Sequence, residues 1–113
     1  MNSKAQVIAI AEHFGWHGIR EHSFEPHHPI GMLGPLRAFM PVPDYLTDLN
    51  AMHEAEKVLT PEQSERYSEF ILDVLQIPSP FIGTARCAFL TGHATAAQRA
   101  EAFLRTVGKW EES

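Results

Sequence analysis

The chain has 113 residues, of which 44% are hydrophobic and 20% are charged, and its formal net charge is −5. These values exclude an intrinsically disordered chain and are typical of one soluble domain with one hydrophobic core, here residues 1–113. The acidic balance argues against general nucleic-acid binding, because affinity for the phosphate backbone requires basic surface. The expected partners are therefore proteins or small molecules.

The sequence also indicates a compartment. The longest apolar run, residues 7–11, is too short to span a bilayer. No cleavage-site pattern follows the N-terminus, so we expect neither a signal peptide nor membrane association. The single cysteine, Cys87, excludes an intramolecular disulfide and fits a reducing environment. We expect a cytoplasmic protein.

The first expected element is a helix over residues 3–14, with Ser3 as the candidate N-cap. Gly15 follows it and is a stop signal, since glycine adopts the left-handed conformation that ends many helices. Trp16 is expected to pack back on this helix. Residues 17–43 lack helical periodicity and form an irregular, loop-rich segment. There we expect two short strands, within residues 18–24 and 36–42, and a mobile loop around residues 27–29.

A capped amphipathic helix is expected between Pro43 and Leu59. Its apolar positions recur at helical spacing and include Leu46, Leu49 and Met52. Either Thr47 or Asp48 is suited to accept a hydrogen bond from the first turn. The next helix begins at a capping box, in which Thr60 is the N-cap, Pro61 occupies the first helical position and Gln63 completes the box.

Residues 81–90 are apolar and are expected to form a buried strand, with a short helix from Thr84 as the alternative. A second capping box, Thr95 with Gln98, opens a last helix that continues to Gly108. The elements together predict the α+β class, with three to four helices packed on a small, mostly antiparallel sheet.

Three segments resemble a known family when taken in order. They are IAEHFGW at residues 10–16, PDYLTDLNAM at residues 43–52 and ATAAQRAEAFL at residues 94–104. Their order is similar to that in the phage ABA sandwich domain family. Its members have a leading helix ending near Gly-Trp, a Pro-Tyr-Ser-Thr-Asp motif before a second helix, and an Ala-Thr-Ala motif before a C-terminal helix.

The chain departs from that pattern at Asp44, which precedes the tyrosine, and at Leu46, which replaces a small polar residue. Residues 17–40 and 60–76 have no clear counterpart. The resemblance implies helices packed on a small sheet and a phage or prophage origin. It implies no catalytic activity.

The histidines do not form a recognised metal motif. His53-Glu54 begins like a His-Glu-x-x-His zinc site, but Lys57 occupies the second histidine position. A second metal hypothesis involves side chains whose spacing matches no single helical or strand face, namely Glu21, His22, Glu25, His27 and His28. We expect no metal or other cofactor. Cys87 with His93 suggests a thiol nucleophile, although a cysteine among alanines and phenylalanine is more typical of a core position.

Two surface features are candidate binding sites. Free N–H groups at the start of the last helix, with nearby arginines and an aromatic ring, suggest an anion or nucleotide site, whereas a solvated face with the arginines next to Glu101 is the more usual meaning of this pattern. The candidate residues of this site are Arg86, Arg99, Arg105 and Trp110. Carboxylates at three- and four-residue spacing form an acidic ridge that is either solvated surface or a docking face for a basic partner. The ridge consists of Glu62, Glu65, Glu69 and Asp73.

The leading hypothesis is a non-enzymatic phage protein that binds and inhibits a host component, such as an antiviral defence protein. It acts in the cytoplasm of an infected or lysogenic bacterium. The alternative is a sequestering binder of a nucleotide signal or another small anion, for which a homodimer with shared pockets is expected. A metal-assisted hydrolase using the loop histidines is the third reading.

Overall fold

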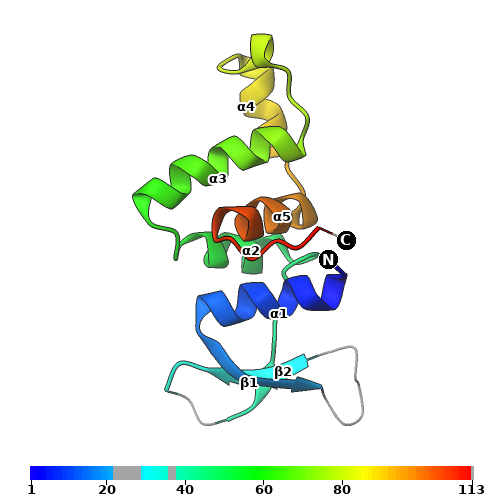
Figure 1. Ribbon diagram of the computed structural model, residues 1–113, viewed down its shortest axis with the longest axis vertical. Coiled ribbons are helices and arrows are strands. Elements are labelled where there is room, and N and C mark those ends of the chain that lie inside the picture. Colours follow the sequence, from blue (N-terminus) through cyan, green and yellow to red (C-terminus); the bar gives the residue numbers. More distant parts are fainter. Residues whose placement is uncertain (22–28, 36–37, 113) are drawn as a thin grey trace.

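The computed structural model describes residues 1–21, 29–35 and 38–112. In chain order the elements are α1 (Ser3–Phe14), β1 (Trp16–Glu21), β2 (Pro29–Leu33), β3 (Met40–Pro41), α2 (Leu49–Glu56), α3 (Pro61–Val74), the 3₁₀ helix η1 (Ser79–Phe81), α4 (Ala85–Gly92) and α5 (Ala96–Thr106). The described residues confirm the α+β class, with five α-helices rather than three to four (Figure 1).

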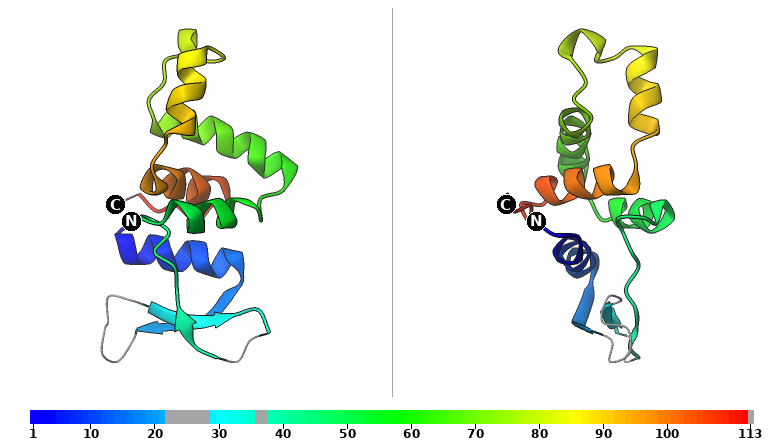
Figure 2. Two further views of the ribbon diagram at one scale, coloured as in Figure 1. Left: turned by 180° about the vertical axis from the view of Figure 1, so that it is seen from behind. Right: turned by 90° about the vertical axis from the view of Figure 1, so that its right-hand side faces the viewer.

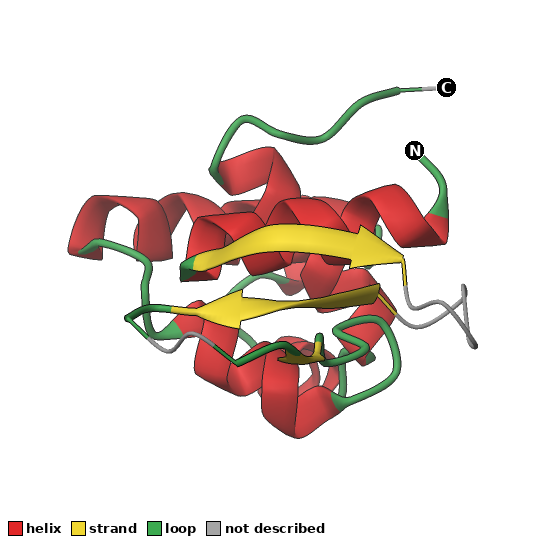
Figure 3. Ribbon diagram, turned by 90° about the horizontal axis from the view of Figure 1, so that it is seen from below, coloured by secondary structure: helices red, strands yellow, loops and turns green. Residues whose placement is uncertain are grey.

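The three strands form one antiparallel sheet in the order β1-β2-β3. Trp16 pairs with Leu33, and the register shifts between His17 and Arg20. Gly18 lies at this irregularity with φ 62°, a backbone conformation that glycine adopts without a steric penalty. The sheet lies at one end of the molecule (Figure 1), and the view from below in Figure 3 shows its strands in front of the helices.

The strand prediction was only partly right. We predicted strands within residues 18–24 and 36–42, and β1 and β3 overlap these ranges. We missed β2, which begins at Pro29, where a loop was expected. Proline lacks an N–H but is tolerated at the first residue of a strand, and the Pro29 carbonyl accepts a hydrogen bond from the Val42 N–H at 2.9 Å. Residues 22–28, with most of the predicted loop, lie outside the described residues.

The hydrophobic core lies between the helices. α5 packs against α3, α1 and α2, so it is the central element of the helical layer (Figure 2). Ile10, Met52, Phe103 and Leu104 are fully buried there. Trp16, at the start of β1, belongs to the same core cluster, as expected for a residue that packs back on the first helix.

Local capping interactions begin and end the helices largely as predicted. The Asp48 carboxylate accepts a hydrogen bond from Ala51 N–H at 3.1 Å, which identifies Asp48 rather than Thr47 as the cap of α2. Both predicted capping boxes are present, at the starts of α3 and α5. Gly15 ends α1 in the left-handed conformation, with φ 119°. One cap differs, because Asn2 rather than Ser3 is the N-cap of α1.

Residues 81–90 do not form the predicted buried strand. The Thr84 hydroxyl accepts a hydrogen bond from Cys87 N–H at 3.2 Å, and the helix α4 follows, as in our alternative reading. The only sheet of the described residues lies at the opposite end of the molecule, so an extended segment here would have no strand to pair with.

The region from residue 76 to residue 93, which we call the arm, projects from the helical layer (Figures 1 and 2). The molecule measures 50 × 26 × 24 Å and its radius of gyration is 15.1 Å. A compact domain of this length has a radius of gyration of about 13 Å. Among the described residues, no helix is long and apolar enough to cross a membrane.

Candidate binding sites

The four residues proposed for anion binding lie in three separate places. Arg86 is on α4 in the arm, and Arg99 lies at the junction of α2, α3 and α5. Arg105 and Trp110 lie together near the C-terminus, with the guanidinium 5.4 Å from the ring centroid. The structure therefore brings together one predicted pair and assembles no single site from all four.

Arg99 is held by contacts within the protein. Its Nε donates to the Ala94 carbonyl at 3.1 Å, and its Nη2 donates to the carbonyls of Thr91 at 3.2 Å and Gly92 at 3.4 Å. Its Nη1 contacts the Glu56 carboxylate at 3.4 Å. The carbonyls at the end of a helix lack hydrogen-bond partners within that helix. Arg99 donates hydrogen bonds to these carbonyls of α4 and so connects the arm to α2 and α5.

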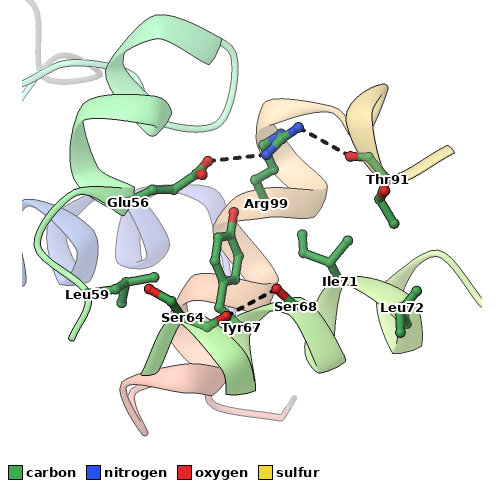
Figure 4. A pocket seen from close by; sticks show the side chains of 9 residues that line it. All are labelled: Glu56, Leu59, Ser64, Tyr67, Ser68, Ile71, Leu72, Thr91 and Arg99. Carbon is green, nitrogen blue, oxygen red and sulfur yellow. Dashed lines mark hydrogen bonds and ion pairs between the residues drawn. The ribbon is translucent and has the colours of Figure 1, made fainter. Parts of the chain in front are cut away.

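Beside this ion pair, Tyr67 of α3 is buried and 7% exposed. Its hydroxyl points toward Glu56 and Arg99 (Figure 4), yet it makes no hydrogen bond with any described residue. Burial raises the pKa of Tyr67 far above its usual value of 10.0, and the negative charge of Glu56 raises this pKa further. The phenol is therefore neutral at physiological pH and supplies a hydrogen-bond donor.

These three side chains line a hollow of about 410 Å³, which we call the Arg99 pocket. Its lining consists of Glu56, Leu59, Ser64, Tyr67, Ser68, Ile71, Leu72, Thr91 and Arg99 (Figure 4). The volume lies within the range of small-molecule sites. Because the charges of Glu56 and Arg99 offset each other, the pocket suits a neutral polar ligand better than a phosphate.

Near the C-terminus, the positive charge of Arg105 beside Trp110 is also offset by carboxylates. The Arg105 Nε contacts the Glu101 carboxylate at 3.1 Å, and its Nη2 contacts Glu112 at 3.3 Å. Two carboxylates within reach of one guanidinium lower its attraction for an anionic ligand. Trp110 packs against the core, and its indole N–H is buried without a partner among the described residues.

Arg86 has a different setting. It is exposed in the first turn of α4 and makes no ion pair or hydrogen bond with the other described residues. It lines a hollow of about 160 Å³, which we call the arm hollow, between the end of α3 and α4. The other residues of this lining are Leu75, Gln76, Ile77, Pro78, Phe81, Cys87 and Leu90. The hollow is thus apolar with a cation at its edge.

The most exposed large apolar side chains of the described residues lie on the arm, and one of them, Phe81, also lines this hollow. Phe81, Ile82 and Phe89 are 49%, 50% and 59% exposed. Sequence reasoning missed them because it placed residues 81–90 inside the core. One signal in the sequence could have revealed them. Thr84 is a good N-cap, which indicates the start of a helix, and the run that follows it lacks the polar face of an ordinary surface helix.

In this geometry His93 is not placed to act as a general base for Cys87, as the thiol hypothesis requires. Cys87 is buried, whereas the His93 ring stacks on Phe89 with the centroids 4.1 Å apart. The Nδ1 of His93 lies 2.8 Å from the Phe89 carbonyl. Within the described residues, no hydrogen bond joins the imidazole to the thiol, so Cys87 is placed as an apolar side chain of the arm.

The metal hypothesis falls largely on residues 22–28, which lie outside the described residues. Glu21 is described, and it forms an ion pair with Lys4. His53 is exposed on α2. Across residues 1–21, 29–35 and 38–112, no three side chains of metal-binding type come together.

The acidic ridge is exposed along α3, as helical spacing predicted. Its four members are Glu62, Glu65, Glu69 and Asp73. None of them takes part in an ion pair with another described residue. The ridge is therefore solvated surface in the isolated chain.

Comparisons with protein-family models, with curated proteins and with solved structures found no match.

Proposed function

We propose that this chain is a phage-encoded protein that acts by binding a host protein through its arm, and that it inhibits that protein by covering its surface. A component of antiviral defence is the leading class of target. The observation that carries the proposal is the exposure of Phe81, Ile82 and Phe89 on a projecting element. Grouped apolar side chains on a soluble protein are typical of interaction sites.

The free energy of burying apolar side chains favours a partner that covers the arm. α4 packs only sparsely on the rest of the protein, so its apolar residues contribute little to folding where they are. Each large apolar side chain that a partner covers contributes about 1.5–3 kcal/mol when fully removed from water. Phe81 lies in η1, Ile82 directly after it and Phe89 in α4, and large aromatic side chains such as these contribute strongly to interface energies.

The phage part of the proposal rests on the three sequence segments that resemble the phage ABA sandwich domain family. By analogy, small phage proteins often act by covering the surface of a larger protein. The cytoplasm of an infected or lysogenic bacterium is the proposed location.

The test compares the wild-type chain with a Phe81→Ala/Ile82→Ala/Phe89→Ala variant as bait in bacterial host lysate, with captured proteins identified by mass spectrometry. Phe39→Ala is the matched control, because Phe39 is 41% exposed and lies outside the arm. We expect a reproducible partner that the control retains and the arm variant loses. The same set of captured proteins with all three baits would contradict the proposal.

The Arg99 pocket favours a second candidate function, the binding of a small molecule. Its volume of about 410 Å³ and the unpartnered Tyr67 hydroxyl support this reading. A thermal-shift panel of nucleosides and nucleotides tests it, since a ligand at 100 times its dissociation constant stabilises the folded state by about 2.7 kcal/mol. The offset charges predict that a nucleoside binds better than its phosphate. No shift with any compound would remove this candidate.

A further inference from the structure

The arm hollow has the size of a socket for one side chain. Its volume of about 160 Å³ is well below the roughly 300–1,000 Å³ of small-molecule sites. Leu75, Ile77, Phe81 and Leu90 provide most of its apolar wall. A single leucine, methionine or phenylalanine side chain is therefore a better occupant than a complete metabolite.

Arg86 is the charged residue in the lining of the hollow. The chain carries 14 acidic residues, yet residues 74–100 contain none. Arg86 lies at the edge of the hollow, without an ion pair to any described residue. The protein thus presents an apolar socket with a cation beside it, and no described acid forms an ion pair with that cation.

We propose that the partner presents an acidic segment to the arm, with one apolar anchor side chain in the arm hollow and an Asp or Glu carboxylate on Arg86. Phe81 then contacts the anchor as part of the lining, and the exposed Ile82 and Phe89 extend the apolar surface of the arm. The inference rests on the proposed function, and it names the chemistry of the partner.

A second copy of this chain is the less favourable occupant of the arm. An isologous dimer brings the same patch of both chains together. Two arms paired in this way bring together two segments that each carry Arg86 and that contain no acid between residues 74 and 100. Like charges that face each other across an interface weaken association, so a partner with acidic residues is preferred.

Arg86 permits a clean test because its replacement leaves the fold intact. It makes no side-chain hydrogen bond or ion pair with the described residues, and it occupies the first turn of α4. A negative charge is favourable near the start of a helix, so Arg86→Glu does not weaken α4. Arg66→Glu is the matched control, because Arg66 is exposed on α3 and lies outside the arm.

The experiment selects binders to the intact chain from a yeast-displayed library of random peptides and removes those that also bind the Phe81→Ala/Ile82→Ala/Phe89→Ala variant. Fluorescence anisotropy then measures the affinity of the enriched peptides. We expect peptides that combine Asp or Glu with an apolar anchor. Arg86→Glu should weaken their binding about tenfold or more, because it removes a charged hydrogen bond and adds a repulsion. Arg66→Glu should leave binding unchanged.

A charge swap provides the decisive control. Peptides with Lys in place of the acid should bind Arg86→Glu better than the wild-type chain. Enriched peptides that are neutral or basic, or whose affinity ignores Arg86→Glu, overturn the acidic partner but leave the arm as the binding surface. A library without any arm-dependent binder overturns the proposed function as well. A wild-type dimer in light scattering that the arm variant turns into a monomer shows a second copy on the arm, which also overturns the inference.

Discussion

Replacing Tyr67 with phenylalanine tests the physical description of the Arg99 pocket most directly. The substitution removes one oxygen atom from a side chain that is 7% exposed and preserves the ring that packs in the core. The hydroxyl has no hydrogen-bond partner among the described residues. Burial of a polar group that has lost its bonds to water costs about 1–3 kcal/mol. Tyr67→Phe should therefore stabilise the folded state.

The size of the effect follows from this cost. The substitution removes the desolvation penalty of the hydroxyl from the folded state, and it also removes the hydration of the phenol from the unfolded state. We therefore expect the free energy of unfolding to rise by about 1 kcal/mol. For a domain of this length, 1 kcal/mol corresponds to a rise in Tm of about 4 °C. Urea denaturation gives the free energy directly, provided that the slope of unfolding stays constant.

The matched control is Thr106→Val in α5. Thr106 is also buried, but its hydroxyl donates to the Ala102 carbonyl at 2.8 Å. Removal of a satisfied hydroxyl should cost about 0.5–1.5 kcal/mol, so the two substitutions should change stability in opposite directions. If Tyr67→Phe instead destabilises the protein as much as Thr106→Val, the Tyr67 hydroxyl is bonded in solution, and the reasoning is wrong.

The remaining predictions concern pH and the attachment of the arm. Since burial raises the pKa of Tyr67 above its unfolded value of 10.0, the folded state retains a proton that the unfolded state loses above pH 10. Stability should fall there as pH rises, and urea denaturation at alkaline pH should show a smaller loss for Tyr67→Phe. Arg99→Ala should lower the free energy of unfolding by about 2 kcal/mol and speed hydrogen exchange in α4. Arg105→Ala removes ion pairs that solvent still reaches, with Arg105 32% exposed, and should cost less than about 1 kcal/mol. Thr84→Ala removes the N-cap of α4 and should destabilise that helix by about 1 kcal/mol, with faster hydrogen exchange confined to the arm.

The contacts of Arg99 connect the two candidate sites, the Arg99 pocket and the arm. The guanidinium contacts the carbonyls of Thr91 and Gly92 at the end of α4 and the Glu56 carboxylate at the edge of the pocket. A change in the pocket that moves Arg99 therefore also releases the carbonyls that anchor the arm. Hydrogen exchange of α4 in the Arg99→Ala variant reports this connection.

The sequence by itself determined the start and end of most helices. Thr60 with Gln63, Thr95 with Gln98, and the stop at Gly15 act over four residues or fewer, so they need no information about distant parts of the chain. The same locality explains why the exposure of the acidic ridge on α3 was predictable.

Only the tertiary structure decided what the apolar and charged segments do. An apolar run reads alike as a buried strand or an exposed helix, and the choice for residues 81–90 depends on where a pairing strand lies. β2 escaped prediction for the same reason, because a strand is defined by its neighbours. The contact of Arg99 with Glu56, 43 residues away in sequence, exists only once α2 and α5 have packed together. Contacts between distant residues have no local signal, since their energy appears only when the chain has folded.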